Sequence, residues 1–189
     1  MCGFVGYVND TPDKSVNEKI IKDMADRIRH RGPDQDDYYV DSSVSLGFRR
    51  LSIIDLDGGS QPILNEDGTK VLVFNGEIYN YQPIREELIK KGHVFRTKTD
   101  SEVLLHGYEE YGCELLNKLR GMFAFVIWDS TEKKLFGARD IFGIKPFFYY
   151  LKNGNFLFGS EIKSFLSNPL FEKELNEERL PDYLCFEYI

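Results

Sequence analysis

The order of strand-like and helix-like segments is the feature that most constrains the fold of this chain. An apolar strand is expected almost at the N-terminus, at residues 3–8, and apolar residues then recur at helical spacing between 16 and 28. Later strand-like runs follow one another through turn signals, such as the Asp–Gly pair at 67–68 and the Asn–Gly pair at 153–154. Strict alternation of strands and helices, the sign of a parallel doubly wound sheet, is missing. The sequence therefore predicts an α+β fold.

This inventory fits two stacked, mainly antiparallel sheets with helices on the outside. The expected strands cover residues 3–8, 36–41, 44–48, 61–64, 70–74, 122–129, 134–139, 146–151 and 155–159. Expected helices begin at a capping-box pattern formed by Ser15 and Glu18, after Tyr81 (ending at Gly92), after Thr99 (ending at Gly112), and near 161–166 and 177–184. We see no internal repeat and no linker, so the 189 residues are expected to form one domain.

Composition and charge indicate which kinds of binding partner and which cellular compartment to expect. The net charge of −7 argues against a nucleic-acid partner, and no apolar run is long enough to span a bilayer. The N-terminus lacks the pattern of a signal peptide. Three widely spaced cysteines form neither a disulfide framework nor a zinc-binding pattern. We therefore expect a cytoplasmic protein that binds no membrane, nucleic acid or metal.

Cys2 is the most unusual position, because it directly follows the initiator Met. Removal of Met1 would give Cys2 a free α-amine with a pKa of about 7.7–8.0. An amine with this pKa is suited to act as a general base that takes the proton from the Cys2 thiol. Such a nucleophile needs no histidine, and the three histidines are scattered without the spacing of a catalytic motif. The alternative interpretation of Cys2 is a small buried strand residue.

Further residues carry groups that could bind the polar or charged parts of a small ligand. The amide of Asn75 and the backbone N–H of Gly76 could hold an oxyanion, although an Asn–Gly pair is also the strongest short turn signal. One of the paired arginines Arg49 and Arg50 could clamp a carboxylate, or both could be solvated surface charges. Asp100 could pair with an ammonium group, or could serve only as the first residue of a helix.

Taken together, the motifs resemble one family. They are Met–Cys–Gly, RHRGPD (29–34), RRLSIID (49–55), FNGEIYN (74–80), TDSEV (99–103), GMFAF (121–125), RDIFGIKP (139–146) and SEIK (160–163). Their order resembles the N-terminal glutaminase domain of glutamine-hydrolysing asparagine synthetases, a class II glutamine amidotransferase. The resemblance implies the four-layer αββα sandwich of N-terminal-nucleophile hydrolases.

The resemblance also implies a role for each matching residue. Cys2 matches the nucleophile that forms a γ-glutamyl thioester, and Asn75 and Gly76 match the oxyanion hole. The remaining matches would bind L-glutamine. Arg50 would grip the α-carboxylate of glutamine, and Leu51 and Ile53 would contribute backbone groups. Glu77 and Asp100 would orient the amide or the α-amine of glutamine. The loop around Arg31 and Gly32 would form a wall of the pocket.

The same resemblance implies a partner that this sequence does not contain. We expect the chain to stop before a C-terminal synthetase domain that uses ATP and Mg to make asparagine from aspartate and ammonia, so no cofactor is expected within residues 1–189. A homodimer is an open possibility. Two alternatives remain: a glutaminase attached to a synthetase with another acceptor (a sugar, a peptide or a natural product), and a non-catalytic glutamine-sensing domain.

Overall fold

Two antiparallel sheets form the centre of the molecule. The computed structural model describes residues 2–51 and 60–187. Within them, a five-stranded sheet has the order β2–β3–β1–β9–β8 and a four-stranded sheet the order β4–β5–β6–β7. Their bounds are β1 Gly3–Val8, β2 Gln35–Val40, β3 Val44–Arg50, β4 Ile63–Leu64, β5 Lys70–Ile78, β6 Gly121–Asp129, β7 Lys134–Arg139, β8 Phe148–Lys152 and β9 Asn155–Gly159.

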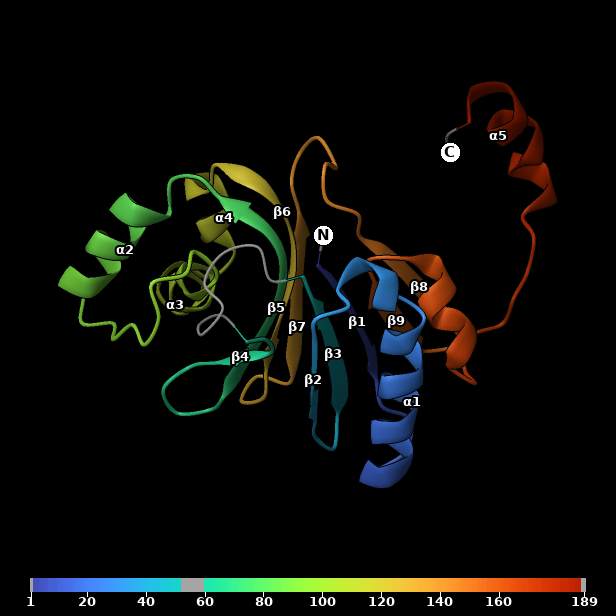
Figure 1. Ribbon diagram of the computed structural model, residues 1–189, viewed down its shortest axis with the longest axis horizontal. Coiled ribbons are helices and arrows are strands. Elements are labelled where there is room, and N and C mark those ends of the chain that lie inside the picture. The colour runs from blue at the N-terminus through green and yellow to red at the C-terminus, as the bar shows by residue number, and fades with distance from the viewer. Residues whose placement is uncertain (1, 52–59, 188–189) are drawn as a thin grey trace.

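The two sheets stack face to face and helices cover their outer faces (Figure 1). The helix α1 (Lys14–Asp26) and the 3₁₀ helix η3 (Ile162–Ser167) cover the five-stranded sheet. On the four-stranded sheet lie α2 (Tyr81–Lys90), α3 (Ser101–Tyr111) and α4 (Leu115–Lys118). The α+β fold and the four-layer αββα sandwich are therefore confirmed.

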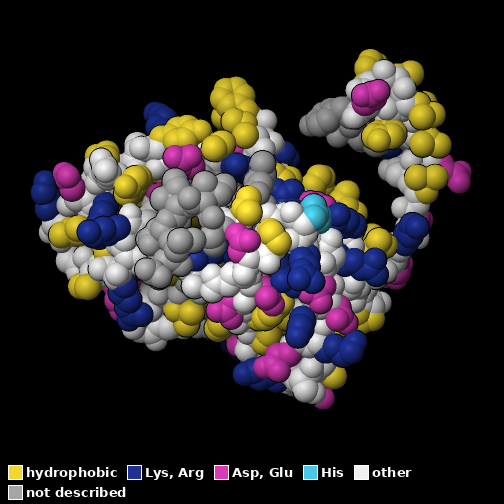
Figure 2. All heavy atoms as spheres, in the orientation of Figure 1, with side chains coloured by type: hydrophobic (Ala, Val, Ile, Leu, Met, Phe, Trp, Pro, Cys, Tyr) yellow, Lys and Arg dark blue, Asp and Glu magenta, His cyan; other side chains and the backbone are white. Residues whose placement is uncertain are grey.

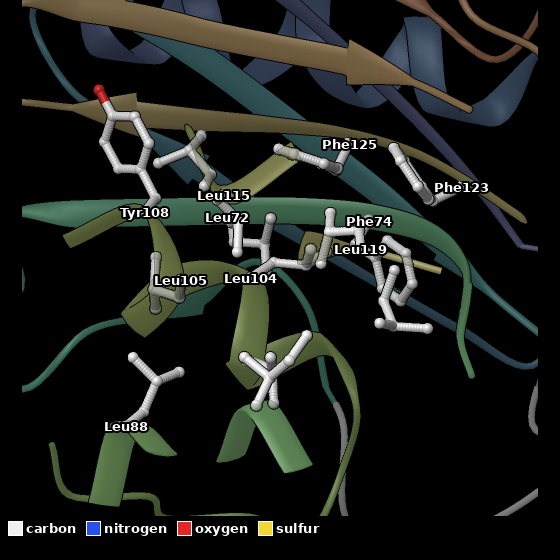
Figure 3. Packing of buried hydrophobic residues seen from close by; sticks show 14 residues of the cluster. Leu72, Phe74, Leu88, Leu104, Leu105, Tyr108, Leu115, Leu119, Phe123 and Phe125 are labelled. Carbon is white, nitrogen blue, oxygen red and sulfur yellow. The ribbon is translucent and has the colours of Figure 1, made fainter. Parts of the chain in front are cut away.

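Three apolar layers hold the sandwich together. One lies between α1 and the five-stranded sheet, and a second lies between the two sheets. In the third, side chains of α2, α3 and α4 pack on Leu72, Phe74 and Ile78 of β5 (Figure 3). Because side chains of a strand alternate between its faces, the odd-numbered residues of β5 face the second layer, as Val71 and Val73 do. This alternation decides which residues reach the space between the sheets.

Several local expectations need correction. Asp13 caps α1, because its carboxylate accepts hydrogen bonds from the N–H groups of Ser15 and Val16, so the expected capping box of Ser15 and Glu18 is wrong. The expected strand at 61–64 shortens to Ile63–Leu64. The 3₁₀ helix η2 (Gly112–Glu114) and α4 were missed, whereas the expected tight turn at Asn153–Gly154 is confirmed by positive φ angles at both residues.

The last segment of the chain stands apart from the sandwich. The 3₁₀ helix η4 (Glu177–Arg179) and α5 (Leu180–Phe186) lie at the end of an extended stretch and contact each other, away from both sheets (Figure 1). The apolar side chains of α5 are exposed, among them Leu184 and Phe186. None of the helices in the described ranges is long and apolar enough to cross a membrane.

A buried histidine ties α3 to the hairpin between β4 and β5. His106 is only 1% exposed. Its Nδ1 lies 3.0 Å from the Glu109 carboxylate and 3.7 Å from that of Glu66, and its Nε2 lies 3.5 Å from that of Glu102. Burial lowers the pKa of His106, but the surrounding carboxylates raise it further, to about 9. The imidazole therefore carries a proton at neutral pH.

This environment predicts how stability depends on pH. The pKa of His106 rises from an ordinary 6.5 to about 9 on folding. Its contribution to the free energy of unfolding is therefore full below about pH 6.5 and is lost as the pH rises toward 9. We expect His106→Gln to lower the free energy of unfolding by on the order of 2 kcal/mol at pH 6, and by clearly less at pH 9.5. Urea unfolding of both proteins at the two pH values measures this. A difference that stays constant with pH would contradict the prediction.

Candidate active site

Cys2 lies directly before β1, at the end of the layer between the sheets. Its side chain is partly buried and packs against the apolar residues of that layer. The Leu51 N–H donates to Cys2 Sγ at 3.4 Å, and the thiol lies 3.7 Å from the Leu51 carbonyl oxygen. Because β1 pairs with β3, the end of β3 is brought beside the thiol. The structure thus places Leu51, an expected binding residue, in contact with Cys2.

Arg31 and Glu161, from distant parts of the chain, hold the backbone of Cys2. Arg31 Nε donates to the Cys2 carbonyl at 3.0 Å, and Arg31 Nη1 donates to Glu161 at 3.0 Å. Arg31 was expected only as part of a pocket wall, and Glu161 was not expected in the site at all. The signal for both was present in the RHRGPD and SEIK motifs, which supply these two residues.

Asn75 points toward the space between the sheets. It pairs with Ala124 on β6, and residues directly opposite in an antiparallel pair share a face. Ala124 belongs to the layer between the sheets, against which Cys2 also packs. Asn75 is 3% exposed, and its Nδ2 has no hydrogen-bond partner among the described residues. A buried amide donor without a partner is costly, which is typical of a group kept for a ligand.

Gly76 offers a backbone N–H on the open edge of β5. The Tyr79 N–H donates to the carbonyl of Arg120, the residue directly before β6. The N–H groups of Phe74 and Ile78 point to the opposite edge of β5, where they donate to the side chains of Gln61 and Asp100. Since hydrogen-bonding directions alternate along a strand, the N–H of Gly76 points to the same edge as those of Phe74 and Ile78. Asn75 and Gly76 therefore lie inside a strand, and the hairpin-turn interpretation of this pair is wrong.

The lack of a side chain at Gly76 is a steric requirement. A Cβ atom there would collide with the Met122 carbonyl and would lie 2.7 Å from Phe123 Cα, both backbone atoms of the paired strand. We expect Gly76→Ala to lower the free energy of unfolding by about 1–3 kcal/mol, as overpacking does. Gly137→Ala in β7 is the matched control, because its nearest neighbour is a Phe147 side-chain atom at 3.3 Å. Urea unfolding compares them, and equal losses would contradict the prediction.

The two arginines at the end of β3 point to opposite faces of the sheet. Arg49 faces α1, where it forms ion pairs with Asp26 and Asp36. Arg50 follows Phe48 on the face between the sheets, on the same side as Cys2, and its Nη1 donates to Gln35 at 3.3 Å. The guanidinium on the same side of the sheet as Cys2 is therefore that of Arg50, the arginine expected from the sequence. Ile53, the other residue expected in this segment, lies outside the described residues.

Asp100 reaches β5 instead of capping its own helix. Its side chain makes no capping hydrogen bond to α3 and instead accepts the Ile78 N–H at 2.7 Å. Burial raises the pKa of Asp100, and the nearby Glu77 carboxylate adds to this, while the Ile78 N–H opposes it. Glu77 is exposed at the end of the same strand. The Asp100 carboxylate thus contacts β5 two residues beyond Gly76, and a bound cation would relieve its repulsion with Glu77.

One set of possible metal ligands occurs in the part of the chain that the structure describes. Ligand atoms of Glu66, His93 and His106 lie within 4.8 Å of one another. The raised pKa of His106 makes a proton compete with a metal ion at neutral pH. The set lies on the helix side of the four-stranded sheet, not in the layer that holds Cys2. We assign it to the ion-pair network of α3.

Two solved structures have a similar fold. The glutamine phosphoribosylpyrophosphate (PRPP) amidotransferase from B. subtilis, complexed with ADP and GMP, aligns with a TM-score of 0.70 and 20% identity over 88% of this chain and 43% of that one. A structure described as the allosteric regulatory enzyme of purine biosynthesis aligns with a TM-score of 0.65, also at 20% identity. These likenesses confirm the expected fold of N-terminal-nucleophile hydrolases.

Sequence comparisons identify the family. Asparagine synthetase [glutamine-hydrolyzing] 1 of Bacillus subtilis is 49% identical over 100% of this chain and 30% of its own length. Asparagine synthetase [glutamine-hydrolyzing] 2 of Arabidopsis thaliana is 41% identical over 87% of this chain and 28% of its length. The chain thus spans about 30% of such relatives. A family model described as a glutamine amidotransferase domain matches residues 1–189, and the chain therefore belongs to the glutamine amidotransferase domain family.

Proposed function

We propose that this domain hydrolyses L-glutamine to L-glutamate and ammonia through a thioester on Cys2. The observation that carries the proposal is the buried, unpartnered amide of Asn75, which faces the same layer as the thiol. A donor left without a partner beside a nucleophile suits an oxyanion that exists only during the reaction. The family supports the choice of a glutamine amide as the bond that is cleaved.

In the proposed mechanism the chain supplies its own general base. After Met1 is removed, the α-amine of Cys2 takes the thiol proton while Sγ attacks the γ-carbonyl carbon of glutamine. The tetrahedral oxyanion is held by Asn75 Nδ2 and the Gly76 N–H. The C–N bond then breaks, the amine returns its proton to the leaving nitrogen, and ammonia departs. Water attacks the thioester with help from the same amine, and glutamate leaves with the thiol restored.

The proposed substrate pocket has one complementary group for each charge of glutamine. Arg50, on the face of β3 shared with Cys2, binds the α-carboxylate. Asp100 and Glu77 bind the α-ammonium, whose positive charge offsets the carboxylate repulsion that helps to raise the pKa of Asp100. Backbone groups of Leu51 and Ile53 complete the contacts in this proposal. Cys2, Asn75 and Gly76 would then meet the amide end.

We further propose that the ammonia serves a C-terminal synthetase domain that uses ATP and Mg to convert aspartate to asparagine. The relatives are about three times as long as this chain, which leaves room for such a domain. The loop between β7 and β8 also supports a covering partner. Ile141 and Phe142 are 93% and 86% exposed, although Asp140 holds the loop by accepting the N–H groups of Ile144 and Lys145. In Figure 1 this loop projects beyond the ends of the two sheets at the top of the view, and Figure 2 shows apolar side chains protruding there.

The direct test is glutamate release from glutamine by the Met1-free protein. We expect glutamate and ammonia in equal amounts, with asparagine a poor substrate because its shorter side chain cannot reach Cys2 while Arg50 and Asp100 hold its charges. Intact mass should confirm that Met1 is absent. A correctly processed, folded protein that neither releases glutamate nor is alkylated at Cys2 by a glutamine-analogue electrophile would contradict the proposal.

A further inference from the structure

Gln61 contacts β5 directly beside the proposed oxyanion hole. It is 8% exposed, and both ends of its side-chain amide bond to the backbone of Phe74. Gln61 Nε2 donates to the Phe74 carbonyl at 3.0 Å, and the Phe74 N–H donates to Gln61 Oε1 at 2.6 Å. Phe74 immediately precedes Asn75 and is the neighbour of Gly76 along the open edge of the strand. One side chain therefore fixes both hydrogen-bonding groups of the residue before the oxyanion hole.

This contact takes the place of the two backbone hydrogen bonds that a longer β4 would make with Phe74. In the β4–β5 pair, Ile63 lies opposite Leu72 and Leu64 opposite Val71, so the same register would place residue 61 opposite Phe74. The strand β4 begins only at Ile63. A side-chain amide has the same donor and acceptor as a peptide group, so it can complete the ladder where the backbone stops.

A strand that continued farther would destroy the site. The next position along this edge of β5 is Gly76, and a further paired residue would occupy its N–H. Beyond Gly76, the edge is held again by Asp100, which accepts the Ile78 N–H. The Gly76 N–H therefore lies between two side-chain contacts, Gln61 on one side and Asp100 on the other. This arrangement holds the strand edge in place and keeps one N–H available.

We propose that Gln61 is a positioning residue for glutamine hydrolysis, holding Phe74 so that the Asn75 amide and the Gly76 N–H meet at one oxyanion. The inference rests on the proposed function, because it assigns Gln61 to the oxyanion hole of that reaction. An oxyanion donor acts only when its position is held to within about 0.5 Å. Both ends of the Gln61 amide bond to Phe74, so we expect its loss to affect the transition state more than the binding of glutamine.

Asn65, in the turn between β4 and β5, offers a matched control that contacts the same strand, β5. It is 4% exposed, and its Oδ1 accepts the Lys70 N–H at 2.9 Å, so it also binds the edge of β5 with a side-chain amide. Lys70 is at the opposite end of β5 from Gly76. Asn65→Ala should therefore lower the melting temperature by a few degrees, much as Gln61→Ala does, while leaving hydrolysis within about twofold of wild type.

The experiment measures steady-state glutamine hydrolysis and thermal unfolding of wild type, Gln61→Ala, Gln61→Glu and Asn65→Ala, all free of Met1. For Gln61→Ala we expect kcat and kcat/KM to fall together by about 10–100-fold, with KM within about twofold. Gln61→Glu keeps an acceptor for the Phe74 N–H but has no donor for the Phe74 carbonyl. We therefore expect its kcat to fall as well.

Two results would overturn different conclusions. A wild-type protein that is processed and folded but does not hydrolyse glutamine would overturn the proposed function, and the role of Gln61 with it. If wild type is active and Gln61→Ala keeps its kcat, or loses no more of it than Asn65→Ala, only the role of Gln61 falls. A loss confined to KM would likewise show that Gln61 shapes substrate binding and not the oxyanion hole.

Discussion

Cys2→Ala should reduce glutamine hydrolysis at least about 10³-fold, because no other group in the described site can form the thioester. The folded state should survive, since alanine keeps the small apolar contact that Cys2 makes at the end of the layer between the sheets. Glutamate release and thermal unfolding together measure the two effects. Cys113→Ala and Cys185→Ala are the controls, because both thiols are exposed and neither packs in that layer.

A second variant separates the thiol of Cys2 from its α-amine. A lysine inserted between Met1 and Cys2 would block removal of Met1, since aminopeptidases prefer a small second residue. Cys2 then keeps its thiol but its nitrogen becomes a peptide nitrogen, which cannot act as a base. We expect this protein to be inactive although iodoacetamide still labels Cys2. Full activity in the extended protein would show that the base lies elsewhere.

The fold was predictable because its signals are local. Runs of apolar and aromatic residues between turn signals placed the described strands within two residues of their observed bounds, except that β5 continues to Ile78, four residues past its expected end at 74. The positive φ angles of Asn153 and Gly154 are what such a turn pair requires. The shortened β4 was not predictable, because the pairing of Phe74 with the Gln61 side chain depends on a contact across 13 positions in the sequence.

The site was less predictable from local pattern than from the resemblance. An Asn–Gly pair favours a turn, and only the long pairing of β5 with β6 shows that Asn75 and Gly76 lie inside a strand. The choice of Arg50 over Arg49 depends on which face of β3 meets the four-stranded sheet, a tertiary property that alternation alone does not settle. The SEIK motif contains Glu161, but its contact with Arg31 spans 130 positions, so no single window of sequence reveals that it helps to hold the backbone of Cys2.

Asn75→Ala is the prediction that best separates catalysis from stability. Removing one oxyanion donor typically costs about 10²–10³ in kcat, and we expect a loss of that size with KM little changed. The buried Nδ2 of Asn75 has no partner among the described residues, so its removal breaks no hydrogen bond in the free protein. The free energy of unfolding should therefore stay the same or rise, since an unsatisfied buried donor is a cost to the folded state.

Asn17 is a control for this prediction, because both ends of its buried side-chain amide have hydrogen-bond partners. It is fully buried, its Oδ1 accepts the Tyr7 hydroxyl at 2.9 Å, and its Nδ2 donates to the Thr11 carbonyl at 2.8 Å. Asn17→Ala should lower the free energy of unfolding by about 1–3 kcal/mol and leave kcat unchanged, because it leaves the buried Tyr7 hydroxyl without this partner. If Asn75→Ala instead loses stability as Asn17→Ala does, its amide is bonded in the folded protein and is not reserved for an oxyanion.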